Sequence, residues 1–166
     1  VSACHKEGVT KEELTSYLIR LLQLDCLYMI NPAGAWTHGG AFADCGLTGR
    51  KIVCDQYGGY ARVGGGALSG KDPTKVDRSA TYMARKIAVD AVKEFEVENC
   101  SVQLGYAIGV ANPVSVHIES TPQGVIPLDF IKRYDLTPSG MIKELGLLSR
   151  NYERIAEGCH FRYDWW

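Results

Sequence analysis

The chain has 166 residues, which suits a single domain, and an apolar fraction of 46% that is ordinary for a globular protein. Its 18 Lys and Arg residues nearly balance 19 Asp and Glu residues, giving a formal net charge of −1. This balance argues against nucleic acid or a charged membrane surface as partner of the whole chain. No apolar run approaches membrane-spanning length.

The six cysteines are scattered through apolar segments, and none forms a C-x-x-C pair or has a histidine at metal-finger spacing. This scatter fits reduced core thiols and a cytoplasmic protein better than an oxidised scaffold, although the even number leaves the scaffold open. The cysteines are Cys4, Cys26, Cys45, Cys54, Cys100 and Cys159.

The N-terminal segment predicts one helix between two strands. Residues 1–8 are expected to form a strand. Thr10 and Glu13 match the capping-box pattern, and apolar residues follow at helical spacing to about Leu24. Residues 26–30 form a short apolar run that predicts the second strand.

The stretch 44–78 holds eight of the eighteen glycines together with a set of basic residues. Glycine lets backbone approach a ligand closely, and cations beside such backbone indicate a polyanion, most often phosphate. The basic residues are Arg50, Lys51, Arg62, Lys71, Lys75 and Arg78.

The glycine loop 64–71 runs into Asp72 and Pro73, which suit the N-cap and first position of a helix that continues to about Phe95. A helix start attracts anions. The loop nearly matches the phosphate-loop pattern G-x-x-x-x-G-K-[ST], but the last position is Asp72, which argues against a standard P-loop. A glycine-rich turn with solvated lysines is the alternative.

Alternating residues in the C-terminal half predict a hairpin. Residues 100–110 alternate apolar with small or polar side chains, Ile108 being on the core side, and residues 114–118 do the same after a turn. Residues 128–134 are expected to form a short helix, and Thr137-Pro138 to start another. This order of elements predicts an α+β fold with sheets covered by helices.

Two long motifs resemble one known family. The run GLTGRKIVCDQYGG at 46–59 and the run GGGALSGKDPTKVDRSATYMAR at 64–85 closely resemble those of S-adenosylmethionine synthetases (methionine adenosyltransferases). The resemblance continues at 30–34, 103–110 and 135–138, and covers nearly the whole chain. It implies an S-adenosylmethionine synthetase-like fold of mixed and antiparallel sheets.

The resemblance also implies a set of site residues. In the family an aromatic residue at the position of Trp36 stacks on adenine, although a lone Trp in a turn is more often a packing residue. Asp44 matches a methionine contact, or simply caps the turn at Gly46. The implied ATP-binding residues are Trp36, Thr37, Asp44, Arg50, Lys51, Ala67 and Lys71. The implied methionine-binding residues are Asp44, Lys75 and Ile108. The implied catalytic residues are Arg50, Lys51, Lys71 and Asp77, with Asp77 also binding Mg²⁺.

Family members have three interleaved α+β domains, and their active sites lie between two subunits. Against that pattern, residues 1–43 match the end of an N-terminal-type domain, 44–78 the phosphate-binding segment of a central domain, and 79–166 the C-terminal domain. The chain opens with Val1 rather than Met, and the family's N-terminal portion has no counterpart in it. We therefore expect a second polypeptide to carry that portion, and further copies to form a dimer or higher oligomer.

The implied reaction joins ATP and L-methionine to give S-adenosylmethionine, phosphate and pyrophosphate, with Mg²⁺ and K⁺ as cofactors. The altered loop 38–43 and the altered tail depart from the family pattern. One alternative is a non-catalytic subunit that regulates or stabilises a full-length synthetase. Another is an independent nucleotide hydrolase, which the Asp72 mismatch disfavours.

Overall fold

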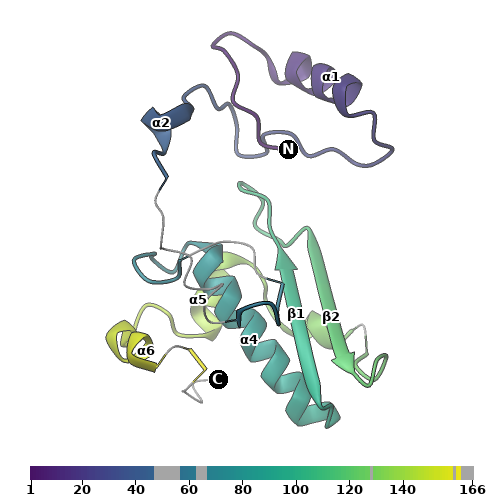
Figure 1. Cartoon of the computed structure of the whole chain (residues 1–166), viewed down its shortest axis with the longest axis vertical. Coiled ribbons are helices and arrows are strands. Elements are labelled where there is room, and N and C mark those ends of the chain that lie inside the picture. Colours follow the sequence, from purple (N-terminus) through teal and green to yellow (C-terminus); the bar gives the residue numbers. More distant parts are fainter. Residues whose placement is uncertain (47–56, 63–66, 128, 159, 162–166) are drawn as a thin grey trace. The chain divides into compact units, whose positions relative to one another are not determined.

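A computed structural model describes residues 1–46, 57–62, 67–127, 129–158 and 160–161 (Figure 1). The chain forms two compact units. Unit 1 comprises Val1–Thr48 and Ala107–Val110, and unit 2 comprises Gly49–Tyr106 and Ala111–Trp166.

The main helix of unit 1 is α1, which spans Lys11–Leu22 and begins as predicted. The N–H of Glu13 donates to Thr10 Oγ1 over 3.2 Å, and the Glu13 carboxylate accepts from the N–H of Thr10 over 2.9 Å. Both halves of the capping box are therefore formed, which satisfies two amides that the helix leaves open.

A small core holds unit 1 together, but the two predicted strands are wrong. The first residues lie along the segment after α1, and Val1 donates to the carbonyl of Met29 over 2.7 Å. At Ala3, however, the side-chain amide of Asn31 takes both the N–H and the C=O, at 2.8 and 2.9 Å. A side chain thus replaces the backbone partner that a strand needs. The buried core residues are Leu14, Leu18 and Ile30.

The loop 38–43 contains a short helix that the sequence did not predict, α2, spanning Gly40–Ala43.

Unit 2 is organised by the twenty-residue helix α4, Val76–Phe95, whose predicted apolar face is confirmed as core. Its predicted start at Pro73 is wrong, because Lys75 is the N-cap. The Asp72 carboxylate accepts from the N–H of Thr74 over 2.8 Å, and the N–H of Lys75 donates to the carbonyl of Asp72 over 3.2 Å. These bonds form a turn that delays the helix. The fully buried residues of the face include Met83, Ile87 and Ala91.

The predicted hairpin is confirmed. Strand β1, Asn99–Gly105, pairs antiparallel with β2, Ser115–Thr121, with Val102 opposite Ile118. The first strand ends earlier than predicted, so the placement of Ile108 in the core is wrong. Ile108 is 78% exposed in a turn that the N–H of Val110 closes on the carbonyl of Ala107.

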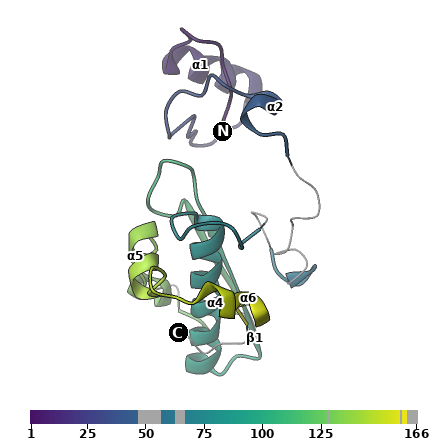
Figure 2. The same ribbon diagram turned by 90° about the vertical axis from the view of Figure 1, so that its left-hand side faces the viewer.

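Three short helices complete unit 2. The 3₁₀-helix η1, Phe130–Arg133, lies within the predicted helix 128–134. Helix α5, Pro138–Glu144, starts as predicted, with the N–H of Gly140 donating to Thr137 Oγ1 over 3.1 Å. Helix α6, Tyr152–Gly158, was not predicted. In the core, α4 packs against β1 and α5 (Figure 2).

The described cysteines are free, but the prediction of core thiols is wrong for three of them. Cys4, Cys26 and Cys45 are exposed, and Cys100 is half-buried. Among the described residues, no helix combines the length and the apolar character that crossing a membrane requires.

Candidate functional site

Three of the predicted site residues gather at the start of α4. Lys71 Nζ lies 2.6 Å from Asp77 Oδ2, and the two side chains are 28% and 43% exposed. Lys75, the N-cap residue, places its Nζ 3.6 Å from the Asp72 carboxylate. Hydrogen bonds from Thr74 lower the pKa of Asp72, with a smaller effect from the Lys75 charge. The result is an accessible cluster of two lysines and two carboxylates at the N-terminal end of α4.

The loop that carries Lys71 is anchored on both sides. Ala67 is followed by Leu68, which is buried in the core. The N–H of Lys71 donates to the carbonyl of Leu68 over 3.3 Å, closing a turn between them. Backbone and core packing therefore fix the direction in which Lys71 leaves the loop.

Arg78 holds this loop to the helix, a role that the sequence did not reveal. Its buried guanidinium donates through Nη1 to the carbonyl of Lys71 over 2.5 Å and through Nε to the hydroxyl of Tyr82 over 3.1 Å. The same group lies 4.1 Å from the ring centroid of Tyr152. The signal in the sequence was the position of Arg78. It is a charged residue one helical turn from apolar core residues of α4, and it is next to Ser79.

The described residues contain no group of three or more His, Cys, Asp or Glu side chains that would hold a metal alone. Asp77 is one accessible carboxylate. Mg²⁺ is often bound by one or two carboxylates together with water and substrate phosphates, so the donor set at α4 fits Mg²⁺ carried by a polyphosphate.

The predicted adenine and methionine contacts of unit 1 are Trp36, Thr37, Asp44 and Ile108. Trp36 is 43% exposed, and its indole N–H donates to the carbonyl of His38 over 2.6 Å. Thr37 Oγ1 lies 3.1 Å from His38 Nδ1. Asp44 accepts from the N–H of Gly46 over 2.8 Å, which confirms the turn-capping role.

Arg50, Lys51 and the predicted strand 52–54 lie outside the described residues, as does the tail 162–166. The structure therefore brings Lys71, Lys75 and Asp77 together in unit 2, which also contains Ala67, while Trp36, Thr37, Asp44 and Ile108 belong to unit 1.

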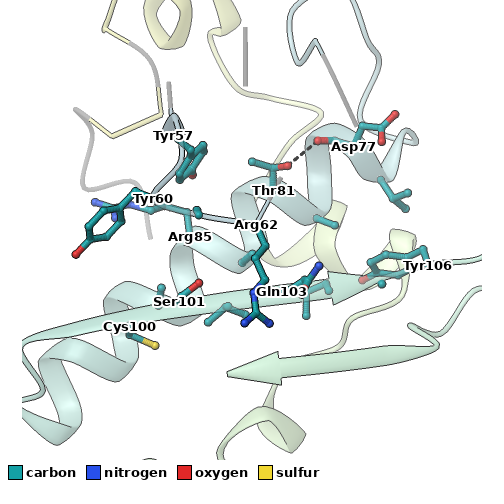
Figure 3. Close-up of a pocket in the computed structure, with 18 of the residues that line it drawn as sticks. Tyr57, Tyr60, Arg62, Asp77, Thr81, Arg85, Cys100, Ser101, Gln103 and Tyr106 are labelled. Atoms are coloured by element: carbon teal, nitrogen blue, oxygen red, sulfur yellow. Dashed lines mark hydrogen bonds between the residues drawn. The ribbon is translucent and has the colours of Figure 1, made fainter. Parts of the chain in front are cut away.

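A cleft of about 620 Å³ opens in unit 2 between α4 and β1 (Figure 3). Asp77, Thr81 and Arg85 line it at successive turns of α4, and the Thr81 hydroxyl donates to the carbonyl of Asp77 over 2.7 Å. The segment from Tyr57 to Arg62 lines another side. The sequence signal for this cleft was the spacing of Asp77, Thr81 and Arg85. Polar residues four positions apart lie on the same face of a helix.

Comparison with known proteins agrees with the motifs. A family model described as S-adenosylmethionine synthetase, C-terminal domain, matches residues 38–165. The fold is similar to the solved structure of an unusual S-adenosylmethionine synthetase from Campylobacter jejuni, with a TM-score of 0.54 and 36% sequence identity over 92% of this chain. The chain spans 44% of the length of that relative.

Proposed function

Because this chain belongs to the S-adenosylmethionine synthetase family, we propose that it is the C-terminal catalytic part of such an enzyme. In this proposal it acts in the cytoplasm and makes S-adenosylmethionine from ATP and L-methionine, releasing phosphate and pyrophosphate. A second polypeptide supplies the N-terminal part of the family fold, and further copies form a dimer or higher oligomer.

The observation that carries this proposal is the cluster of Lys71, Lys75 and Asp77 at the start of α4. Two flexible cations stand at the N-terminal end of the helix, and a carboxylate suited to a divalent cation, Asp77, lies two positions after Lys75. Such an arrangement favours binding of a polyphosphate–metal complex. A subunit with only a structural role would not need it.

The proposed reaction requires little covalent catalysis by the protein. The lone pair of the methionine sulfur forms a bond to the ribose 5′ carbon of ATP, while the bond from that carbon to the triphosphate oxygen breaks. Sulfur is already nucleophilic, so no general base is required. The chain's task is to align the two atoms and to neutralise the charge that develops on the departing triphosphate.

Lys71 and Lys75 are proposed to supply that charge, together with Arg50 and Lys51. Asp77 would hold Mg²⁺, which when bound neutralises phosphate oxygens. The family generally uses K⁺ as well as Mg²⁺. When the nucleotide complex binds, Lys71 would leave the Asp77 carboxylate and pair with a phosphate group, while Asp77 would pair with Mg²⁺. Neither side chain would then be without a counter-charge.

The proposed adenine and methionine contacts follow from the resemblance to the family. Trp36 keeps an exposed ring that is suited to stacking on adenine, with Thr37 beside it. Asp44 and Ile108 are proposed to contact methionine, together with Lys75. The 78% exposure of Ile108 leaves its side chain accessible to a ligand or a second subunit.

Unit 1 also offers apolar surface to the second polypeptide. Leu21, Leu24 and Leu27 are exposed around the end of α1, with Leu27 at 92%. Covering these side chains would remove apolar surface from water, which is the usual driving force for association.

The test combines the chain with a polypeptide carrying the family's N-terminal part, ATP, methionine, Mg²⁺ and K⁺, and measures S-adenosylmethionine. Lys71→Ala is expected to reduce turnover by about 10²-fold or more, as for the loss of other preorganised charge-stabilising groups. Lys93→Ala, at the exposed C-terminal end of the same helix, is the matched control and should keep full turnover.

The alternatives predict different results. Turnover that is unchanged by Lys71→Ala would favour the non-catalytic subunit and overturn the proposal. Hydrolysis of ATP by this chain alone, without methionine, would favour the nucleotide hydrolase.

A further inference from the structure

Arg85 is the charged residue of the α4–β1 cleft that lacks a counter-ion among the described residues. Arg62, which also lines the cleft, lies 2.8 Å from the Glu119 carboxylate. Asp77, at one end, is neutralised by Lys71 at 2.6 Å. The cleft therefore presents a local positive charge at Arg85.

A donor atom of Arg85 is also unused. Its Nε is buried and has no hydrogen-bond partner in the described part of the chain. Its guanidinium lies over the ring of Phe161, whose centroid is 5.1 Å from Cζ. An aromatic face attracts the cation but does not accept the hydrogen bond that a buried N–H requires. Among the described residues, the Nε–H of Arg85 therefore has no hydrogen-bond acceptor.

The nearby histidine does not fill this role. His160 is buried and bonds to the Tyr57 hydroxyl at 2.5 Å. Burial, together with the Arg85 charge, lowers the pKa of His160 to about 4, so the ring is neutral near pH 7. An imidazole carries no negative charge in either protonation state, so His160 leaves the Arg85 charge uncompensated.

The walls of the cleft show what kind of molecule would fit. Hydroxyl and amide groups of Thr81, Ser101 and Gln103 line it, and Ala84 and Val102 add apolar surface. Figure 3 shows Tyr57 and Tyr60 above the helix at the same end as Arg85. A volume of about 620 Å³ is in the range of small-molecule sites.

From this charge, unused donor and lining, we infer that the cleft binds a small organic anion. Its carboxylate or phosphate group bonds to the Arg85 guanidinium, whose planar fork matches two oxygens of either group. Its apolar or aromatic body lies along α4 and β1. Arg85 lies eight positions after Asp77, about 12 Å along the helix, so the site is distinct from the proposed triphosphate site.

The test records the Nε–H signals of arginine side chains by ¹⁵N–¹H correlation spectroscopy on the full chain. The probes are benzoate and phenyl phosphate, with benzyl alcohol as the neutral analogue. Either anion is expected to shift the Arg85 signal saturably at about millimolar concentration, while benzyl alcohol gives no such shift. Whichever of the two binds more tightly identifies the anionic group.

Arg85→Gln is expected to weaken binding of the anion by about tenfold or more, followed through backbone amides of β1. The matched control is Arg133→Gln, an arginine outside the cleft that pairs with Glu94 at 2.6 Å and should not affect binding. Arg85→Lys keeps the charge without the fork and is expected to bind with intermediate affinity.

Absence of a saturable shift with both anions would overturn the inference, and so would equal binding of the neutral alcohol. The wild-type titration stands even if Arg85→Gln does not fold. None of these readouts requires S-adenosylmethionine synthesis, so the inference and the proposed function fail independently.

Discussion

Lys71 Nζ lies 2.6 Å from Asp77 Oδ2, so that a cation at the end of a glycine-rich loop neutralises a carboxylate in the first turn of α4. Both residues were singled out for opposite reasons, Lys71 for phosphate and Asp77 for a metal ion. Their direct pairing means that each serves as the other's counter-ion in this structure.

Asp77→Asn should separate function from stability. The pair is partly exposed, so its loss is expected to change the free energy of unfolding by less than about 1 kcal/mol. S-adenosylmethionine formation with the second polypeptide should fall by about 10²-fold, because Asp77 is proposed to hold Mg²⁺. Urea unfolding and product assays measure the two effects. Asp129→Asn, an exposed carboxylate before η1, is the control, and full activity of Asp77→Asn would contradict the proposed role.

Arg78→Met should destabilise unit 2 and release the Lys71 loop. The change leaves the carbonyl of Lys71 and the hydroxyl of Tyr82 without their donor, a loss of about 2–3 kcal/mol. Urea unfolding measures the cost, and amide hydrogen exchange at Lys71 measures the release. Arg133→Met removes an exposed arginine and should cost less than about 1 kcal/mol. Equal effects of the two substitutions would show that Arg78 does not anchor the loop.

Gly140→Ala should destabilise α5 although alanine is the better helix former. A Cβ at this buried position would collide with the carboxylate of Asp135, which accepts bonds from the N–H and hydroxyl of Thr137. Overpacking typically costs about 1–3 kcal/mol, more than the helix propensity of alanine returns. Ser139→Ala, at an exposed neighbouring position, should stay within about 0.5 kcal/mol in the same urea experiment. A more stable Gly140→Ala variant would refute this account of the site.

His160 should make the stability of unit 2 depend on pH. Burial, and then the Arg85 charge, lowers its pKa from 6.5 to about 4 in the folded chain. Between these pH values the unfolded chain therefore binds more protons than the folded chain. The contribution of His160 to the free energy of unfolding is complete above pH 6.5 and is lost as the pH falls to about 4. The full loss corresponds to about 3 kcal/mol.

The measurement compares urea unfolding of the wild type and His160→Gln across that pH range. Gln can still hydrogen bond to Tyr57 but does not titrate, so the difference between the two proteins should shrink or reverse as the pH falls. Parallel pH profiles would exclude His160 as the source.

Local signals in the sequence predicted the elements that local interactions determine. The capping box at Thr10, the start of α5 at Thr137 and the paired strands all depend on residues within a few positions or on a simple alternation. The start of α4 was wrong because Asp72 and Pro73 carry the same pattern whether Asp72 caps a helix or, as here, a turn at Thr74.

Distant contacts explain what the sequence could not predict. Tyr57 and His160 are 103 residues apart in the sequence, yet the Tyr57 hydroxyl lies 2.5 Å from His160 Nε2. Arg78 looked like one more phosphate-binding cation because its partners, among them Tyr152, are known only once α4 and α6 are folded. Ile108 continued the alternation of β1 past Gly105, where the pairing with β2 ends.

One helix, α4, carries the core residues on one side and the cleft residues Asp77, Thr81 and Arg85 on another. Inserting a single residue within it would rotate everything on the far side of the insertion by about 100°. The interior cannot accept that rotation, so substitutions can reshape the cleft but the spacing along this helix is fixed by the hydrophobic packing behind it.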